Sequence, residues 1–255
     1  MIEFRDVHKR FGDKVVLAGF SLEVRDGETM VVLGYSGSGK SVALKHIVGL
    51  LEPDAGAVVV DGETVHQLDR AGLTALRTRI GYVFQFAALL DSMTVRENIT
   101  LGLKRQGLPE TEQQERVTEA LALVDLPDTA ERYPAELSGG MRKRVGIARA
   151  IALRPRYILY DEPTTGLDPV TAAVIDRLMV RTRERLGVTG VVVTHDMRSA
   201  FSVGDRIAML YRGAIRQVGT VEQIQRTHDP VVRQFIEGRP EAEGDAEQAF
   251  LGAVG

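Results

Sequence analysis

One eight-residue stretch constrains the fold of this chain more than any other, and it runs Gly34-Tyr-Ser-Gly-Ser-Gly-Lys-Ser41. It follows a short apolar run at residues 28–33 and precedes a helix-like stretch at residues 40–50. A G-x-x-x-x-G-K-S spacing between a strand and a helix is that of a loop whose backbone N–H groups bind phosphate. The glycines allow the tight turn, and the helix adds its positive N-terminal end. This feature predicts an α/β core that binds a nucleotide.

The side chains of this loop have separate expected roles. Lys40 supplies positive charge to the β- and γ-phosphates, and Ser41 offers a hydroxyl to Mg²⁺. A Gly/Ser-rich turn that binds nothing is the alternative, but the flanking strand and helix favour the phosphate loop. The other residues expected to contact the nucleotide here are Gly34, Tyr35, Ser36, Gly37, Ser38, Gly39 and Val42.

Two acidic residues, Asp161 and Glu162, end a second apolar strand that begins at Tyr157. The carboxyl ends of parallel strands are where ligands of open α/β folds bind. Asp161 is suited to holding Mg²⁺, usually through water, and Glu162 to acting as general base on the attacking water. An Asp-Glu pair after a strand more often starts a helix or lies in a loop. The phosphate loop in the same chain favours the catalytic interpretation.

Strands and helices alternate along most of the chain. Residues 2–25 hold two β-rich runs that break at Gly12-Asp13, which predicts a hairpin. The remaining pattern predicts a mainly parallel sheet covered on both faces, an N-terminal antiparallel β-subdomain, and a helical subdomain at about 86–153 inserted in the core. Strands are expected at 28–33, 58–60, 80–84, 157–160, 190–194, 206–210 and 214–218, and helices at 40–50, 94–105, 110–124, 138–153 and 170–186.

Composition narrows the class of protein. A formal net charge of −3 does not suggest a nucleic-acid-binding protein, whose domain would carry a strongly basic surface. The absence of cysteine excludes disulfides and thiolate metal sites, and it fits a reducing compartment. No apolar run approaches the roughly 18 residues of a membrane span, and the N-terminus lacks the apolar stretch of a signal peptide. We therefore expect a cytoplasmic chain that contacts a membrane only through a partner.

A third motif, Leu137-Ser-Gly-Gly-Met141, stands between the phosphate loop and the acidic pair. A serine and two glycines at a helix start form an anion site, which a single domain would hardly need beside the Lys40 loop. In this order, over about residues 2–238, the motifs resemble those of the ATP-binding cassette (ABC) ATPases. The resemblance implies the ABC ATPase fold, with ATP and Mg²⁺ as cofactors. It also implies that Ser138, Gly139 and Gly140 of one subunit cover the γ-phosphate bound to a second copy.

The resemblance assigns roles to further residues. His195, after a strand, would contact the γ-phosphate, although a lone histidine at a strand end is usually structural. Gln85 would reach Mg²⁺ and water. The expected metal-site residues are therefore Ser41, Asp161 and Gln85. The expected catalytic residues are Glu162, His195 and Gln85. Phe11 would stack on adenine, or else pack as an ordinary hydrophobic side chain. Asp168 would lie across the dimer interface.

Three segments, 133–144, 161–169 and 229–238, resemble the Mla-type phospholipid-transport ATPases, which work with mammalian-cell-entry (MCE) proteins. Met141 occurs also in some importers for methionine or osmolytes. The resemblance implies a motor subunit at the cytoplasmic face of the inner membrane. Its partners would be a second copy of itself, a separate permease, and as further candidates an MCE-type protein and a small regulatory subunit. Two alternatives stay open, namely a motor for a small polar solute and a soluble nucleotide-gated switch. The main interpretation is a motor for phospholipid transport through that permease. The matching residues contact ATP or partner proteins, so they do not establish the cargo's identity or the direction of transport.

Two segments have more than one interpretation. Phe86-Ala-Ala-Leu-Leu90 could line a groove for a permease helix or pack in the core. Residues 1–237 are expected to form the ATPase domain, and residues 238–255 an acidic tail. That tail is either flexible without a role or docks Phe250 and Leu251 on a neighbouring subunit.

Overall fold

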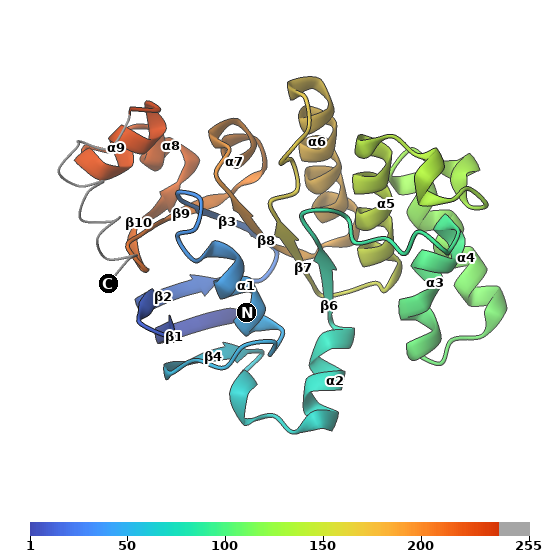
Figure 1. Ribbon diagram of the computed structural model, residues 1–255, viewed down its shortest axis with the longest axis horizontal. Coiled ribbons are helices and arrows are strands. Elements are labelled where there is room, and N and C mark those ends of the chain that lie inside the picture. Colours follow the sequence, from blue (N-terminus) through green and yellow to red (C-terminus); the bar gives the residue numbers. More distant parts are fainter. Residues whose placement is uncertain (240–255) are drawn as a thin grey trace.

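The computed structural model describes residues 1–239 and contains a six-stranded sheet in the order β10-β9-β3-β8-β7-β6 (Figure 1). Five strands pair in parallel, and β10 runs antiparallel to β9 at one edge. The predicted mainly parallel sheet is therefore confirmed. Its strands are β3 (Thr29–Leu33), β6 (Ile80–Val83), β7 (Tyr157–Asp161), β8 (Thr189–Thr194), β9 (Arg206–Tyr211) and β10 (Ala214–Thr220).

A second, antiparallel sheet has the order β2-β1-β4-β5. β1 (Ile2–Phe11) and β2 (Lys14–Val24) form the predicted hairpin, and Gly12 in its turn has a φ of 57°. β4 (Ala55–Val60) and β5 (Glu63–Thr64) form a second hairpin. The chain then passes through a 3₁₀ turn (Val65–Gln67) into α2 (Arg70–Thr78), a helix that the sequence pattern did not indicate.

The two faces of the parallel sheet belong to different cores, because successive side chains of a strand point to opposite faces. Met30 and Val32 of β3 pack with the antiparallel sheet and with α1 (Lys40–Ile47). Val31 and Leu33 pack with the helices on the other face. Those helices are α5 (Gly139–Ala152), α6 (Pro169–Leu186), α7 (Met197–Val203), α8 (Val221–Gln225) and α9 (Pro230–Ile236).

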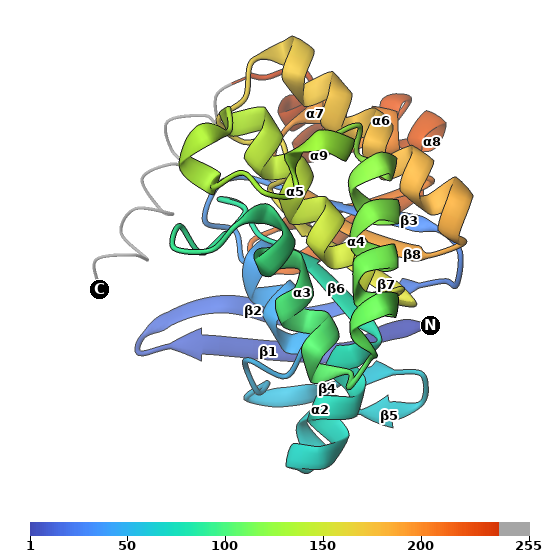
Figure 2. The same cartoon turned by 90° about the vertical axis from the view of Figure 1, so that its right-hand side faces the viewer.

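The helices α3 (Val95–Arg105) and α4 (Glu110–Leu123) pack against α5 on the side of the molecule where β6 forms the edge of the sheet (Figure 2). Two 3₁₀ turns, Pro127–Thr129 and Pro134–Glu136, connect α4 to α5. A capping box between Thr94 and Glu97 starts α3, since each side chain bonds the other's backbone N–H. All three helices fall within the 86–153 range expected for the helical subdomain, whose boundaries stay a prediction.

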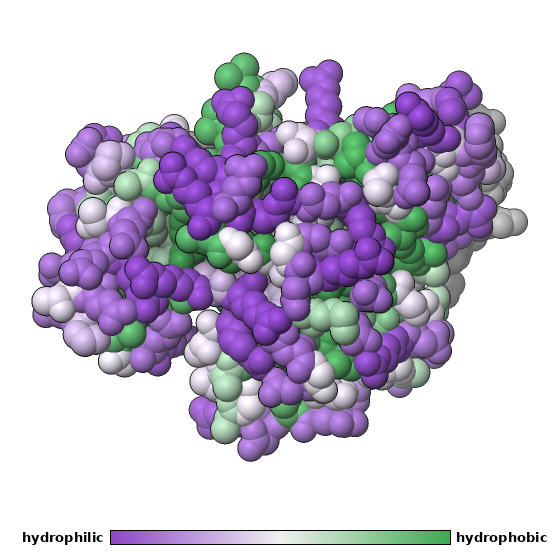
Figure 3. Space-filling view, turned by 180° about the vertical axis from the view of Figure 1, so that it is seen from behind, coloured by the Kyte–Doolittle hydropathy of each residue, from purple (hydrophilic) through white to green (hydrophobic). Residues whose placement is uncertain are grey.

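The surface on the reverse of the molecule is hydrophilic over most of its area (Figure 3). Within residues 1–239, no helix combines the length and the apolar character that crossing a membrane requires. The expected tail falls on residues 240–255 apart from its first two residues, and so lies outside the described part of the chain.

Candidate active site

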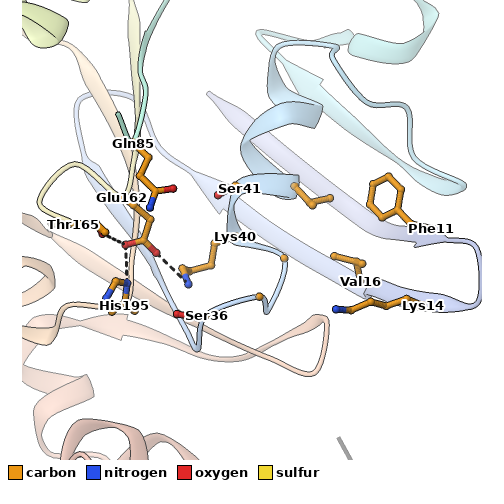
Figure 4. Close-up of a pocket in the computed structure, with 13 residues that line it drawn as sticks. Phe11, Lys14, Val16, Ser36, Lys40, Ser41, Gln85, Glu162, Thr165 and His195 are labelled. Carbon is orange, nitrogen blue, oxygen red and sulfur yellow. Dashed lines mark hydrogen bonds and ion pairs between the residues drawn. The ribbon is translucent and has the colours of Figure 1, made fainter. Parts of the chain in front are cut away.

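A cavity of about 490 Å³ lies between the phosphate loop, the β1–β2 hairpin and the segments that follow β6, β7 and β8 (Figure 4). This volume is in the range of ligand pockets, about 300–1,000 Å³. The cavity brings together most of the expected site. It adds Lys14 and Val16, which the sequence did not indicate, and Thr165, which the resemblance placed with Asp168 at the dimer interface. Its lining consists of Phe11, Lys14, Val16, Ser36, Gly37, Gly39, Lys40, Ser41, Val42, Gln85, Glu162, Thr165 and His195.

The phosphate loop needs its glycines for conformation and for space. Gly39, just before α1, has a φ of 105°, and a Cβ there would lie 2.9 Å from Val16 Cγ1. A Cβ at Gly34 would lie 2.7 Å from the backbone oxygen of Leu210. The Ser38 hydroxyl is buried and has no hydrogen-bond partner among the described residues. Ser38 does not line the cavity.

The Lys40 ammonium group is buried and neutralised within the chain. It donates hydrogen bonds to the backbone oxygens of Gly34, at 2.8 Å, and Tyr35, at 2.9 Å. Its Nζ also lies 3.3 Å from Glu162 Oε1. Burial lowers the pKa of Lys40, while the carboxylates of Glu162 and Asp161 oppose that shift. A phosphate entering the loop would take over from these oxygens.

Oxygen-bearing side chains that could hold a magnesium ion lie beside the loop. Ser41 Oγ donates to Asp161 Oδ1 at 2.6 Å, and the Tyr82 hydroxyl donates to Oδ2 at 3.0 Å. Burial and the Asp161 carboxylate raise the pKa of Tyr82, so the phenol stays a donor. Gln85 lines the same cavity, and its backbone oxygen accepts a hydrogen bond from Lys143.

The donor set fits Mg²⁺, which prefers a few hard oxygen ligands together with water and substrate phosphate. Within residues 1–239 there is no group of three or more His, Cys, Asp or Glu residues suited to a metal ion. The protein would offer the ion one carboxylate, from Asp161, one hydroxyl, from Ser41, and one amide, from Gln85. The ion would need phosphate oxygens to complete its shell.

Glu162 lies between the lysine and the histidine (Figure 4). Its Oε2 is 2.8 Å from His195 Nδ1 and accepts a hydrogen bond from Thr165 Oγ1 at 3.0 Å. The Glu162 backbone has a φ of 48°, which is uncommon for a residue with a side chain. Its N–H donates to the Val193 oxygen at 3.0 Å, which holds this conformation at the end of β7. The carboxylate is therefore fixed at the cavity wall by contacts from three segments.

The Ser138 motif lies in a different cavity, of about 420 Å³. Ser138 caps α5 by accepting from the Met141 N–H at 3.2 Å, and Asp168 caps α6 by accepting from Val170 and Thr171, each at 3.0 Å. Ser138, Gly139, Gly140 and Asp168 all line this second cavity, and none of them lines the first. The N-terminal ends of α1 and α5 thus line two separate cavities of one chain.

Phe11 is half-exposed at the end of β1 and lines the first cavity, which favours the stacking interpretation over ordinary core packing. Phe86 is 83% exposed, whereas the adjacent Ala87 is buried. The Phe86–Leu90 segment therefore mixes surface and core residues, and Phe86 is not part of the core.

The chain is similar in sequence to known transporter proteins. Residues 17–165 match the family model described as ABC transporter. The methionine import ATP-binding protein MetN of Caulobacter vibrioides is 43% identical over 252 residues, which are 98% of this chain and 75% of that protein. MetN of Xylella fastidiosa is 41% identical over 241 residues, which are 92% of this chain and 72% of that protein.

The fold of the chain is also similar to those of solved structures. The dimeric ATP-binding cassette MJ0796, in a post-hydrolysis state bound to ADP and phosphate, superposes with a TM-score of 0.78 at 36% identity, over 87% of this chain and 99% of that one. For cbiO1 of Clostridium perfringens, part of the transporter complex cbiONQ, the TM-score is 0.82 at 28% identity, over 91% of this chain and 93% of that one.

Proposed function

This chain belongs to the ABC transporter family as an ATP-hydrolysing cassette, and we propose that it drives an importer for a small polar solute, with methionine as the first candidate. The proposed cargo is supported by the identity of about 40% to methionine import ATPases over nearly the whole chain. Those relatives favour the small-solute alternative over phospholipid transport. In this proposal the chain lies at the cytoplasmic face of the membrane, held there by a separate permease.

Hydrolysis uses the residues of the first cavity. The Lys40 ammonium moves from its backbone partners to the β- and γ-phosphates, and Phe11 stacks on the adenine. Glu162 accepts a proton from the attacking water, and His195, 2.8 Å from that carboxylate, orients it and contacts the γ-phosphate. Ser41, Asp161 and Gln85 would hold Mg²⁺. When bound, that ion neutralises the charge that develops on the phosphate oxygens.

The second anion site supports a dimer. Ser138, Gly139 and Gly140 lie outside the Lys40 cavity of their own chain, and the N-terminal end of a helix attracts a phosphate. In the proposed assembly these residues cover the γ-phosphate bound to the other copy, and Asp168 lies at the same interface. MJ0796, at 36% identity, is dimeric with ADP and phosphate bound. ATP binding would then join the two copies, and hydrolysis would release them.

Phospholipid is the second candidate cargo. The segments 133–144, 161–169 and 229–238 favour it, because they resemble the Mla-type ATPases. All three segments belong to a subunit that binds ATP and a permease, so their resemblance concerns partners more than cargo. An MCE-type protein and a small regulatory subunit are expected partners only under this candidate.

Purification of the tagged protein from detergent-solubilised membranes, with identification of proteins and bound lipid, tests both candidates. A permease with a solute-binding protein supports import of a polar solute, whereas a permease with an MCE-type protein and phospholipid supports the second candidate. Absence of any membrane partner contradicts both.

Phe86→Ser should abolish recovery of the permease, because Phe86 is 83% exposed beside Gln85. Leu50→Ser, at a residue 59% exposed just beyond α1, is the matched control and should leave recovery unchanged.

A further inference from the structure

The phosphate loop packs against the C-terminal helix through aromatic side chains. The ring of Tyr35, which follows Gly34 in the loop, lies 4.7 Å from the ring of Phe235 in α9, at an interplanar angle of 89°. It also lies 6.5 Å from the ring of Tyr211, the last residue of β9. Edge-to-face pairs at such distances are favourable contacts. Residues 200 positions apart in the sequence thus meet at the nucleotide site.

The helix that carries Phe235 is itself held by the sheet. Asp229 caps α9 by accepting from the backbone N–H groups of Val231, at 3.0 Å, and Val232, at 3.2 Å. The Arg216 guanidinium of β10 donates to the other Asp229 oxygen at 2.8 Å. Val232 is fully buried in the core beneath. α9 is therefore a fixed support rather than a loose end, and it contributes no residue to the lining of the cavity.

Tyr35 joins this support to the phosphate-binding group. Its backbone oxygen accepts a hydrogen bond from Lys40 Nζ at 2.9 Å, while its ring packs on α9. When Lys40 turns to a phosphate, that hydrogen bond is lost, while the ring contact and the hydrogen bond from the Ser38 N–H to the Tyr35 oxygen, at 3.2 Å, remain. A loop without the ring contact would spend less time in the conformation that binds ATP, and its apparent affinity would fall by that fraction.

We propose that Phe235 is a positioning residue for the phosphate loop, acting through the ring of Tyr35, so that α9 sets the affinity for ATP without touching the nucleotide. This inference rests on the assignment of the Lys40 cavity as the ATP site.

Replacement of the Phe235 ring tests the proposal. Phe235→Leu keeps an apolar side chain but removes the edge-to-face contact, and it should weaken ATP binding and raise KM about two- to tenfold. Turnover at saturating ATP should change by less than about twofold, because no cavity residue is altered. Phe235→Tyr keeps the ring and should restore the affinity. Val231→Ala, on the first turn of the same helix, is the matched control and should bind ATP as the unaltered protein does.

A double-mutant cycle with Tyr35→Leu separates this coupling from general destabilisation. If the two rings act through each other, the double variant binds ATP no more weakly than the weaker single variant, whereas independent effects multiply. Multiplying effects, an unchanged Kd in Phe235→Leu, or a lower turnover with unchanged KM would overturn the proposal. Lys40→Ala distinguishes a wrong assignment of the ATP site from a wrong role for Phe235. If it binds ATP normally, the site assignment itself is wrong. If it loses ATP while Phe235→Leu does not, only the role of Phe235 is wrong.

Discussion

Glu162→Gln gives the most direct test of the active-site chemistry. The substitution keeps the size and position of the side chain but removes the proton acceptor. In the structure this carboxylate lies 2.8 Å from His195 Nδ1 and 3.3 Å from Lys40 Nζ. Gln can retain the hydrogen bond from Thr165 to Oε2, which is 3.0 Å long. We therefore expect an intact cavity that binds ATP and hydrolyses it very slowly.

The expected size of the effect follows from the role of a general base. Removing such a group lowers a rate by about 10²- to 10⁴-fold, and each hundredfold is about 2.7 kcal/mol of activation free energy. ATP affinity should not fall in parallel. Lys40 keeps its two backbone partners and loses only the competing carboxylate, so its ammonium becomes more available to phosphate.

Single-turnover phosphate release and size-exclusion chromatography with ATP measure the two quantities separately. The variant should release phosphate at least about a hundred times more slowly and should accumulate as an ATP-bound dimer. Glu119→Gln is the matched control, because Glu119 is 63% exposed in a surface ion pair with Arg154. It should turn over at the rate of the unaltered protein. Turnover of Glu162→Gln within about tenfold of that rate would refute the assignment of Glu162 as the base.

Three further predictions concern other parts of the chain. Lys40→Ala should weaken ATP binding itself, because the phosphates lose their buried charge, and isothermal titration calorimetry would measure this. Gly140→Ala should impair ATP-dependent dimerisation but not ATP binding by the single chain, because its Cβ would lie 2.5 Å from Thr171 Cγ2 at the start of α6; ultracentrifugation with and without ATP checks it. Asp176→Asn should raise the melting temperature at pH 7, because burial raises the pKa of Asp176 despite its hydrogen bond from Ser199, and the folded state therefore disfavours the charged form. The gain should shrink as the pH falls and disappear below the ordinary carboxyl pKa of about 3.8, where both the folded and the unfolded state hold the proton, and calorimetric scans over that range would show it.

The residues that the sequence predicted correctly as neighbours share one geometric property. The segments of Lys40, Glu162 and His195 each follow a strand of the parallel sheet, and the carboxyl ends of such strands meet at one edge. Their positions after strands indicated this edge for Lys40 and Glu162, whereas the resemblance to the ABC ATPases was needed to include His195. Lys14 and Val16 lie on a separate antiparallel sheet, and only the docking of that sheet onto α1 places them in the cavity.

The helices that the sequence pattern did not indicate are short. They are α2, with nine residues, α7 and α9, with seven each, and α8, with five. Each follows a side chain that caps the backbone, namely Asp69, Asp196, Asp229 and Thr220. An isolated cap followed by about two turns gives too little periodicity to identify a helix. The contact between Tyr35 and Phe235 has no sequence signal at all, since it depends on how α9 returns to the sheet.

A single chain holds Lys40 in a state that opposes hydrolysis, and this explains why a second copy would matter. The ammonium group pairs with Glu162 at 3.3 Å, so the charge that should bind phosphate and the carboxylate that should accept a proton neutralise each other. In the proposed mechanism, bound ATP draws Lys40 away and leaves Glu162 with His195, 2.8 Å from its carboxylate, which is the arrangement a general base requires. The γ-phosphate then needs further positive potential, and the helix end at Ser138 in the proposed partner copy supplies it while excluding water from the site. Hydrolysis would thus be coupled to closure of the dimer, because the base and the phosphate site of one chain reach their working geometry only when ATP and the second helix end are both present.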